Sequence, residues 1–265
     1  PSVDFKRCGS SNLISTKKTK ILIDCGSGVT QRLHQSKNSL ADIDALLLTH
    51  LHTDHVIDLY QVIISSWHSD RTSSWKIYGP KGTKKFIDKI FLAWKNERKL
   101  RISYEKRKSS KALNYKVYEF ENVGKIKIND IKIKYFEVDH KPVTFAYGFS
   151  FFNNNKKLTI SGDTRPCENL MKFAHNSDVL LHEGFIEGEI KETNKMRTKK
   201  TLHNVQRYHT SSSQVGKVAF ITKSKKLVLT HFVPTRFNVS RLKKIIRKDF
   251  GKDPVIGKDL LKISI

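Results

Sequence analysis

The sequence has few cysteines and no long apolar run. Its three cysteines, Cys8, Cys25 and Cys167, form neither a CxxC pair nor a disulfide framework, which favours a reducing compartment. No apolar stretch approaches the roughly 20 residues that cross a bilayer, so we expect no membrane segment. The given chain also begins without a signal peptide. A cytoplasmic location is favoured, and a periplasmic one is the alternative if an N-terminal signal has been removed.

The sequence also lacks internal repeats, low-complexity linkers and stretches rich in Pro, Gly or Ser. Its 265 residues, 38% of them hydrophobic, can build one sizeable core. We therefore predict a single domain over residues 1–265.

Acidic residues are scarce. The chain has 25 Asp and Glu against 50 Lys and Arg, which gives a net charge of +25. Such a surface attracts nucleic acid, anionic lipid or phosphorylated substrates. The alternative is compositional, because Lys far outnumbers Arg and Asn, Ile and Ser are plentiful. In "KKFIDKIFLAW" the apolar residues recur at helical spacing, which predicts a core-facing stripe made of Phe86, Ile87, Ile90, Phe91 and Trp94.

Strand-like and helix-like segments alternate along the chain, which predicts an α/β fold. Short apolar segments bounded by turn residues predict strands at 20–28, 45–50, 75–82, 131–140, 157–163, 178–184 and 226–231. Helical patterns lie between several of them, at 55–66, 167–175 and 211–223.

Five of these strands end in residues that can bind a metal ion: His50, His140, Asp163, the pair His182–Glu183, and His231. In α/β folds, functional groups collect beyond the carboxyl ends of strands. One strand that ends in histidine is unremarkable, but five with His, Asp or Glu indicate a metal centre.

The segment "THLHTDH" adds His52, Asp54 and His55 to the candidate ligands. Imidazole and carboxylate groups suit zinc, although manganese and iron accept the same donors. His50 and His52 on an extended segment can share one ion with His140. Asp54 and His55 can face a second ion with His231, and Asp163 can bridge them. Two ions about 3.5–4 Å apart would hold a hydroxide near neutral pH.

These motifs, in this order, resemble the metallo-β-lactamase superfamily in its ribonuclease Z-like branch. The first motif of the family is matched by "ILIDCGSG", with Asp24 as a structural acid, and the second by "THLHTDH". The later motifs are matched by His140 with "AYGFSF", by "SGDTRPCENL" and by "LVLTHF". The resemblance implies an αββα four-layer sandwich with a dimetal site at one edge of the two sheets. The family's usual first strand is absent, so we expect that the chain starts short.

The same resemblance assigns the remaining roles. Asp54 would also orient the hydroxide, and Glu183 with His209 would protonate the leaving oxygen. Read without the resemblance, His209 would be a surface histidine that opens a helix. His182 is expected to be structural, and ordinary surface histidines are expected at His34, His68, His175 and His203.

The predicted activity is metal-dependent hydrolysis of phosphodiesters. One alternative is endonucleolytic processing of tRNA 3′ ends. It is disfavoured by "HEGF" and by the short segment 151–158, which stands in place of a tRNA-gripping arm. The other alternative is arylsulfatase activity, because "YHTSS" resembles the arylsulfatase-like relatives. A non-catalytic nucleic-acid-binding protein is the weakest reading. We expect an anionic ester substrate, and homodimers occur among relatives. The basic loop 191–200 should border the active site and meet substrate anions through Lys195, Arg197, Lys199 and Lys200.

Overall fold

A computed structural model of the chain describes residues 4–190, 193 and 197–265. Its residues form two compact units. The first unit is Cys8–Glu121, and the second unit combines Pro1–Arg7 with Asn122–Ile265. Among the described residues, no helix is long and apolar enough to span a bilayer. Each unit combines a sheet with helices, which confirms the predicted α/β class. A single domain over the whole chain stays a prediction.

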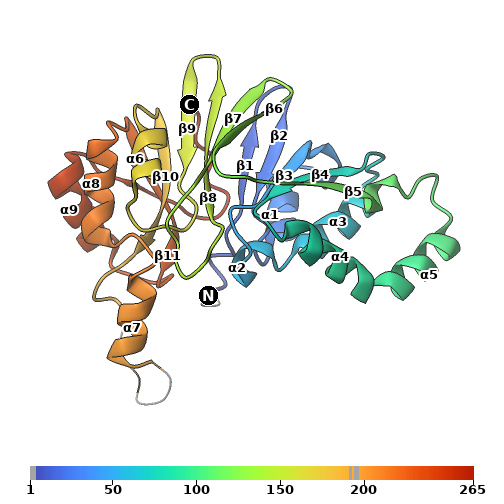
Figure 1. Cartoon of the computed structure of the whole chain (residues 1–265), viewed down its shortest axis with the longest axis horizontal. Coiled ribbons are helices and arrows are strands. Elements are labelled where there is room, and N and C mark those ends of the chain that lie inside the picture. The colour runs from blue at the N-terminus through green and yellow to red at the C-terminus, as the bar shows by residue number, and fades with distance from the viewer. Residues whose placement is uncertain (1–3, 191–192, 194–196) are drawn as a thin grey trace. The chain divides into compact units, whose positions relative to one another are not determined.

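The first unit contains a five-stranded mixed sheet in the order β1-β2-β3-β4-β5 (Figure 1). Strand β1 is antiparallel to β2, and the remaining neighbours are parallel. The strands are β1 (Asn12–Ser15), β2 (Lys20–Ile23), β3 (Ala45–Leu47), β4 (Trp75–Gly79) and β5 (Tyr115–Glu119). The helices are α1 (Val29–Gln35), α2 (Thr53–Val56), α3 (Leu59–His68), α4 (Thr83–Ala93) and α5 (Lys95–Glu105), with short 3-10 turns at Leu40–Asp42 and Lys111–Leu113.

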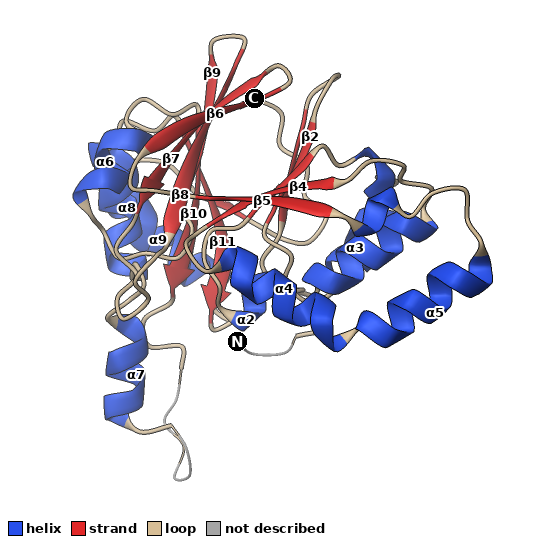
Figure 2. Cartoon of the chain, turned by 45° about the vertical axis from the view of Figure 1, so that its right-hand side comes forward, coloured by secondary structure: helices blue, strands red, loops and turns tan. Residues whose placement is uncertain are grey.

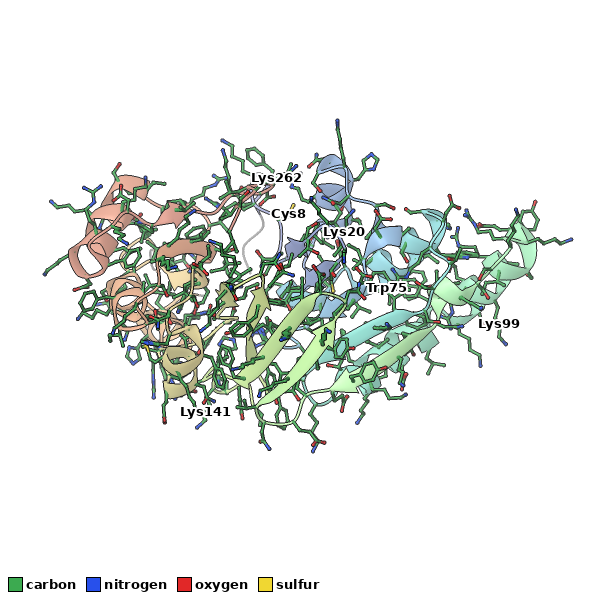
Figure 3. The ribbon with its side chains drawn as sticks, turned by 90° about the horizontal axis from the view of Figure 1, so that it is seen from above. Cys8, Lys20, Trp75, Lys99, Lys141 and Lys262 are labelled. Atoms are coloured by element: carbon green, nitrogen blue, oxygen red, sulfur yellow. The ribbon has the colours of Figure 1, made fainter. Side chains whose placement is uncertain are left out.

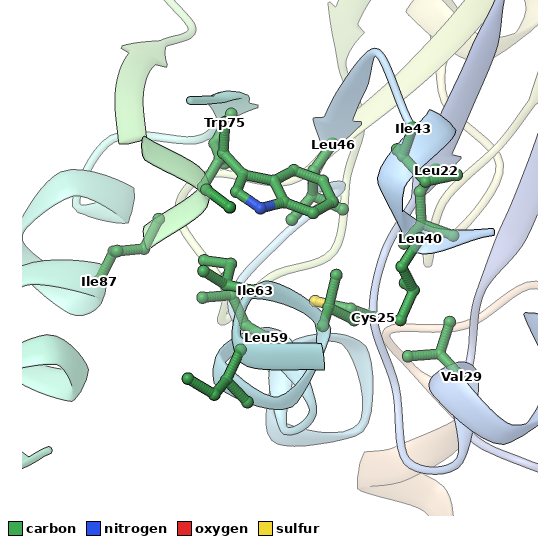
Figure 4. Close-up of a cluster of buried hydrophobic side chains, with 14 of the residues drawn as sticks. Leu22, Cys25, Val29, Leu40, Ile43, Leu46, Leu59, Ile63, Trp75 and Ile87 are labelled. Carbon is green, nitrogen blue, oxygen red and sulfur yellow. The ribbon is translucent and has the colours of Figure 1, made fainter. Parts of the chain in front are cut away.

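Helices α1, α3 and α4 pack on one face of this sheet, around the fully buried Trp75 (Figure 4). The indole nitrogen of Trp75 donates to Ser66 Oγ over 3.1 Å, so the buried ring leaves no polar atom unsatisfied. The apolar stripe of α4 buries Ile87 and Phe91 as predicted. Trp94 was predicted to face the core and does not. It is 49% exposed and stacks on Tyr60 instead, because α4 ends one residue before it.

The second unit contains a seven-stranded mixed sheet in the order β12-β11-β10-β9-β8-β7-β6. Strands β9 to β12 are parallel, and β6 to β9 form an antiparallel meander. The strands are β6 (Gly124–Ile128), β7 (Ile131–Glu137), β8 (Tyr147–Asn153), β9 (Lys156–Ile160), β10 (Val179–Phe185), β11 (Lys226–Val233) and β12 (Val255–Ile256). The helices are α6 (Glu168–Ala174), α7 (Lys199–Gln206), α8 (Ser212–Ile221) and α9 (Val239–Phe250).

Helices α6, α8 and α9 cover one face of the seven-stranded sheet (Figure 2). They bury Leu170, Val215 and Ile246 against the sheet residues Leu180 and Leu229. The N-terminal residues join this unit through Arg7, whose guanidinium donates to the Gly257 carbonyl and lies over the Phe232 ring.

All seven predicted strands are present, within a few residues of the predicted bounds. The predicted helices at 167–175 and 211–223 correspond to α6 and α8. The pattern at 55–66 is two helices, α2 and α3, and Asp58 lies between them with its carboxylate accepting from the Gly28 amide.

Candidate metal centre and active site

In the first unit, the HxHxDH segment gathers four candidate ligands at the end of β3. The ring centroid of His50 lies 4.6 Å from that of His52 and 4.2 Å from that of His55. His52 precedes the first turn of α2, which carries Asp54 and His55; the carboxylate of Asp54 lies 4.0 Å from His55 Nε2. His50 and His55 are buried, whereas Asp54 is 19% exposed. The strand end and the short helix therefore hold imidazoles and a carboxylate in one place.

Asp24 fixes the orientation of this segment. Its carboxylate accepts from the Thr49 amide over 2.8 Å and lies 2.8 Å from His55 Nδ1. The Thr49 hydroxyl contacts Asp24 Oδ2 over 2.9 Å and His50 Nδ1 over 3.0 Å. A carboxylate held against Nδ1 of an imidazole sets its tautomer and directs Nε2 toward a metal ion. Asp24 therefore has the structural role that was predicted for it.

In the second unit, His140 follows β7 and is fully buried. Its Nδ1 lies 2.8 Å from the backbone carbonyl of Tyr208, which can only accept a hydrogen bond. The imidazole therefore donates from Nδ1, and Nε2 is the nitrogen that can bind a cation. The orientation of His140 depends on a main-chain atom 68 residues further along the chain.

Asp163 and His231 lie together where β11 departs from regular pairing. Asp163 Oδ2 is 3.3 Å from His231 Nε2. Between His182 and Gly184 on β10, the register on β11 moves from Leu229 to Phe232, so β11 carries one extra residue. His231 has φ of 45°, a left-handed conformation that is rare for residues other than glycine. Such bulges re-aim a side chain, and this one turns His231 toward Asp163.

Glu183 and His209 form a buried pair beside Asp163. Glu183 Oε1 lies 3.1 Å from His209 Nδ1 and accepts from the Thr210 amide over 2.8 Å. The His209 ring nitrogen is also 4.0 Å from Asp163 Oδ2. The backbone amide fixes the carboxylate, and the carboxylate fixes the imidazole. A histidine that donates from Nδ1 to an acid is set up to exchange a proton at Nε2.

Asp163, His209 and His231 each offer one ligand atom, and these atoms lie within 4.8 Å of one another. Sequence reasoning gave His209 a role in proton transfer only. The geometry of the second unit makes it a candidate metal ligand as well.

His182 is fully buried on β10, directly before Glu183. Its Nδ1 lies 2.8 Å from the Glu183 carbonyl, and within the described residues its Nε2 has no hydrogen-bond partner. Burial lowers the pKa of His182, against the opposing influence of the Glu183 carboxylate. A neutral imidazole in this place fits the predicted structural role.

Sequence reasoning missed the groups that orient the predicted residues. Thr49, the Tyr208 carbonyl and the Thr210 amide each fix an imidazole or a carboxylate. Thr49 stands directly before His50, so its hydroxyl could have been suspected. Backbone groups carry no signal in the sequence. The predicted basic loop 191–200 falls partly outside the described residues, Lys195 included, and the described Lys199 and Lys200 begin α7.

Solved structures with the same fold cover nearly the whole chain. Human tRNase Z, short form, superimposes with a TM-score of 0.72 at 20% identity, and the match covers 99% of this chain and 94% of that one. The metallo-β-lactamase fold protein YhfI from Bacillus subtilis gives 0.71 at 20% identity, covering 95% and 89%. The chain therefore has the metallo-β-lactamase fold, as predicted.

Sequence similarity identifies the class more closely. A ribonuclease Z from Mycolicibacterium gilvum is 31% identical over 241 residues, which span 89% of this chain and 82% of that protein. Fold, motifs and this similarity define a ribonuclease Z-like, metal-dependent hydrolase of phosphodiester bonds. Within this class, the chain belongs to the family described as "Anti-Pycsar protein Apyc1", which matches residues 3–196.

Proposed function

We propose that seven side chains bind two divalent metal ions and that the chain uses them to hydrolyse phosphodiesters. We assign His50, His52 and His140 to one ion, and Asp54, His55 and His231 to the other. Asp163 would serve both. Zinc suits this set of imidazoles and carboxylates best, and manganese or iron accept the same donors.

The observation that carries this proposal is how the candidate ligands are oriented within each unit. Nδ1 lies within hydrogen-bond distance of an oxygen in each of three pairs: His55 with Asp24, His50 with Thr49, and His140 with Tyr208. When Nδ1 is hydrogen-bonded, Nε2 is the ring nitrogen that can bind an ion, which is how metal-binding histidines are held in proteins. Burial of His50, His55 and His140 would be costly without such partners.

The bound ions would supply a nucleophilic oxygen at neutral pH and neutralise the anionic phosphodiester. The side chains of the protein would do the rest. Asp54, which is partly exposed, would orient this oxygen. His209, held by Glu183 over 3.1 Å, would donate a proton to the leaving oxygen. That proton matters most when the leaving group is an alkoxide, as it is in RNA.

A second candidate is processing of RNA 3′ ends. It is favoured by the relative at 31% identity, whose name is ribonuclease Z, and by the net charge of +25. A sulfate ester remains a further candidate substrate, because it is also tetrahedral and anionic.

The test is metal-reconstituted hydrolysis of three substrates side by side: bis(p-nitrophenyl) phosphate, a precursor tRNA with a 3′ trailer, and p-nitrophenyl sulfate. The H52A variant should lose all activity, and H34A, which changes an exposed histidine on α1, should keep it. Turnover of the diester alone would support a small-molecule phosphodiesterase. Trailer cleavage at low enzyme concentration would support the ribonuclease, and faster sulfate turnover would reject both.

The basic loop 191–200 remains a proposed contact for substrate anions. Replacing Lys195, Arg197, Lys199 and Lys200 with glutamine should raise the Michaelis constant for anionic substrates and leave kcat nearly unchanged. An unchanged Michaelis constant for all of the substrates would reject this role for the loop.

A further inference from the structure

One face of strands β6 to β9 in the second unit carries five lysines around a phenylalanine. In the β6–β7 pair, Lys125 lies directly opposite Lys134, and Lys127 opposite Lys132. On the next strands, Phe152 of β8 pairs with Lys132 and with Lys157 of β9. Residues in direct register point to the same side of a sheet, so these side chains share one face. We call it the lysine face: Lys125, Lys127, Lys132, Lys134, Phe152 and Lys157.

Helix α6 covers only the neighbouring part of this side of the sheet. Phe136 stacks on Phe173 of α6 at 4.6 Å, and Ser150 donates to the Phe173 carbonyl over 2.9 Å. Beyond these contacts, the β6–β7 and β8–β9 hairpins extend past the helix (Figures 1 and 2). Lys125 and Lys127 are exposed, as is Lys132. The lysine face is therefore open to a large ligand.

The charges of the lysine face are not neutralised within the described part of the chain, where Lys125, Lys127, Lys132 and Lys134 form no ion pair. Like charges directly opposite each other in a sheet are unfavourable. Burial and the nearby charge of Lys134 both lower the pKa of Lys157, whose ammonium group donates to the His175 carbonyl. A bound polyanion would remove this repulsion.

Helix α5 shows how the same chain treats basic side chains elsewhere. There Arg101 pairs with Glu97 and Glu105, and Arg107 also pairs with Glu105. Lys99 on the same helix points outward (Figure 3). The net charge of +25 is thus spread over both units, but acids accompany it on α5 and are missing from the lysine face.

Phe152 provides an aromatic ring on the lysine face against which the ring of a nucleic-acid base could stack. The ammonium groups of Lys134 and Lys157 lie 5.4 and 5.7 Å from its ring centroid. Cationic side chains around a partly exposed aromatic ring are the arrangement that binds single-stranded nucleic acid, where phosphates meet cations and a base stacks. A membrane surface would need apolar side chains that project to insert, and Phe152 is half-buried.

Edge protection explains only part of the pattern. Lysines on an edge strand discourage pairing with another chain, which accounts for Lys125 and Lys127 on β6. Strands β7 and β9 are interior strands of the sheet, so Lys132, Lys134 and Lys157 have no edge to protect.

We propose that the lysine face binds single-stranded nucleic acid, with phosphates on its lysines and a base on Phe152. This proposal is independent of the metal ions and of the reaction, because it concerns binding alone.

The experiment measures binding of a fluorescein-labelled 12-nucleotide oligouridylate by anisotropy at several salt concentrations, with a gel to show that the RNA stays intact. The variant K125Q/K127Q/K132Q/K134Q should bind about tenfold or more weakly. The slope of log K against log salt should fall by about 2 to 3, since each lost phosphate contact on a single strand contributes about 0.7. F152A keeps the charge and should bind about fivefold or more weakly.

The matched control is K95Q/K99Q/K106Q/K108Q, which removes four exposed lysines on and after α5. It should change the dissociation constant by less than about threefold. Equal weakening in both quadruple variants would overturn the proposal, because net charge alone would then explain binding. K125R/K127R/K132R/K134R should bind like the wild type, which separates charge from a folding defect.

Two further results would also overturn it. The first is unchanged RNA affinity in the lysine-face variant together with lost solubility, which would mean edge protection only. The second is unchanged RNA affinity with lost binding to vesicles of 30% phosphatidylserine, which would mean a membrane surface. Hydrolysis of bis(p-nitrophenyl) phosphate should be the same in all of these variants, so a failed metal site would be recognised separately.

Discussion

The two units present their candidate ligands in different ways. In the first unit, four of them fall within six consecutive residues, and the carboxylate of Asp24 contacts Thr49 and His55. In the second unit, His140, Asp163, Glu183, His209 and His231 come from five segments spread over 92 positions of the sequence. Backbone groups of Tyr208 and Thr210 hold two of these side chains. The ligands of the first set are therefore neighbours in the sequence, although a distant carboxylate orients them, whereas the topology of the sheet brings together those of the second set.

The largest effects are expected when one imidazole is removed from each unit, which tests whether both units contribute ligands. H52A and H231A should each lower kcat/KM for bis(p-nitrophenyl) phosphate by more than about 10³-fold and reduce the metal bound per chain, because both ions act in the reaction. Steady-state rates and metal analysis of the purified variants would measure this. If one of them kept wild-type activity and metal content, its unit would contribute nothing to the centre.

The pair of Glu183 and His209 belongs to the second unit alone. E183Q and H209A should slow cleavage of RNA or a dialkyl phosphate by about 10²–10⁴-fold, since a proton must reach an alkoxide leaving group. The rate with p-nitrophenolate as leaving group should change little. E187Q, a change at an acid four residues further along, is the control. Equal losses on both kinds of leaving group would point to metal binding by His209 instead.

A substitution of Asp24 tests how the candidate ligands of the first unit are oriented. D24N should weaken metal binding about 10- to 100-fold, the usual cost of losing a carboxylate that orients a ligand. Asparagine tolerates the φ of 58° found at this position, so the change isolates the charge. Competition with a chelating dye would measure the affinity. In the second unit, Y208F should leave it unchanged, because His140 contacts the Tyr208 backbone; a loss there would contradict this account.

The smallest effects are expected at surface acids, one in each unit. Ion pairing with Lys84 lowers the pKa of Asp88, and hydrogen bonds from Lys225 and the Lys157 amide lower that of Asp178. A lowered carboxyl pKa stabilises the fold above the ordinary value of about 4, and this contribution is lost as the pH falls through the lowered pKa.

D88N and D178N should therefore each reduce the free energy of unfolding at pH 7 by less than about 1 kcal/mol, and the difference from wild type should shrink below pH 4. Urea unfolding at pH 7 and pH 3.5 would measure it. If the difference in the free energy of unfolding between variant and wild type grew at low pH, the ionised carboxylates would not stabilise the fold as argued.

The same contrast explains what the sequence could predict. Alternation of apolar segments located seven strands, and strand-end histidines located the candidate ligands of both units. The bulge near His231 and the bond from His140 to the Tyr208 carbonyl could not be predicted, because pairing partners between distant strands determine both. Strands β1, β5, β6, β8 and β12 were missed. Trp94 was misplaced by extending a helical pattern one residue too far.

The extra residue in β11 determines which side chains of this strand face the core and which reach the candidate site. Leu227 and Leu229 face the core, and after the bulge Phe232 resumes that role. Deleting Thr230 would restore strict alternation with Phe232 still on the core side, and the imidazole of His231 would then occupy the place of Thr230. A change of length in this strand therefore displaces a candidate ligand even where the core packing is kept. We expect such length changes to be purged during evolution here, while the β8–β9 turn, which holds no ligand, is free to vary in length.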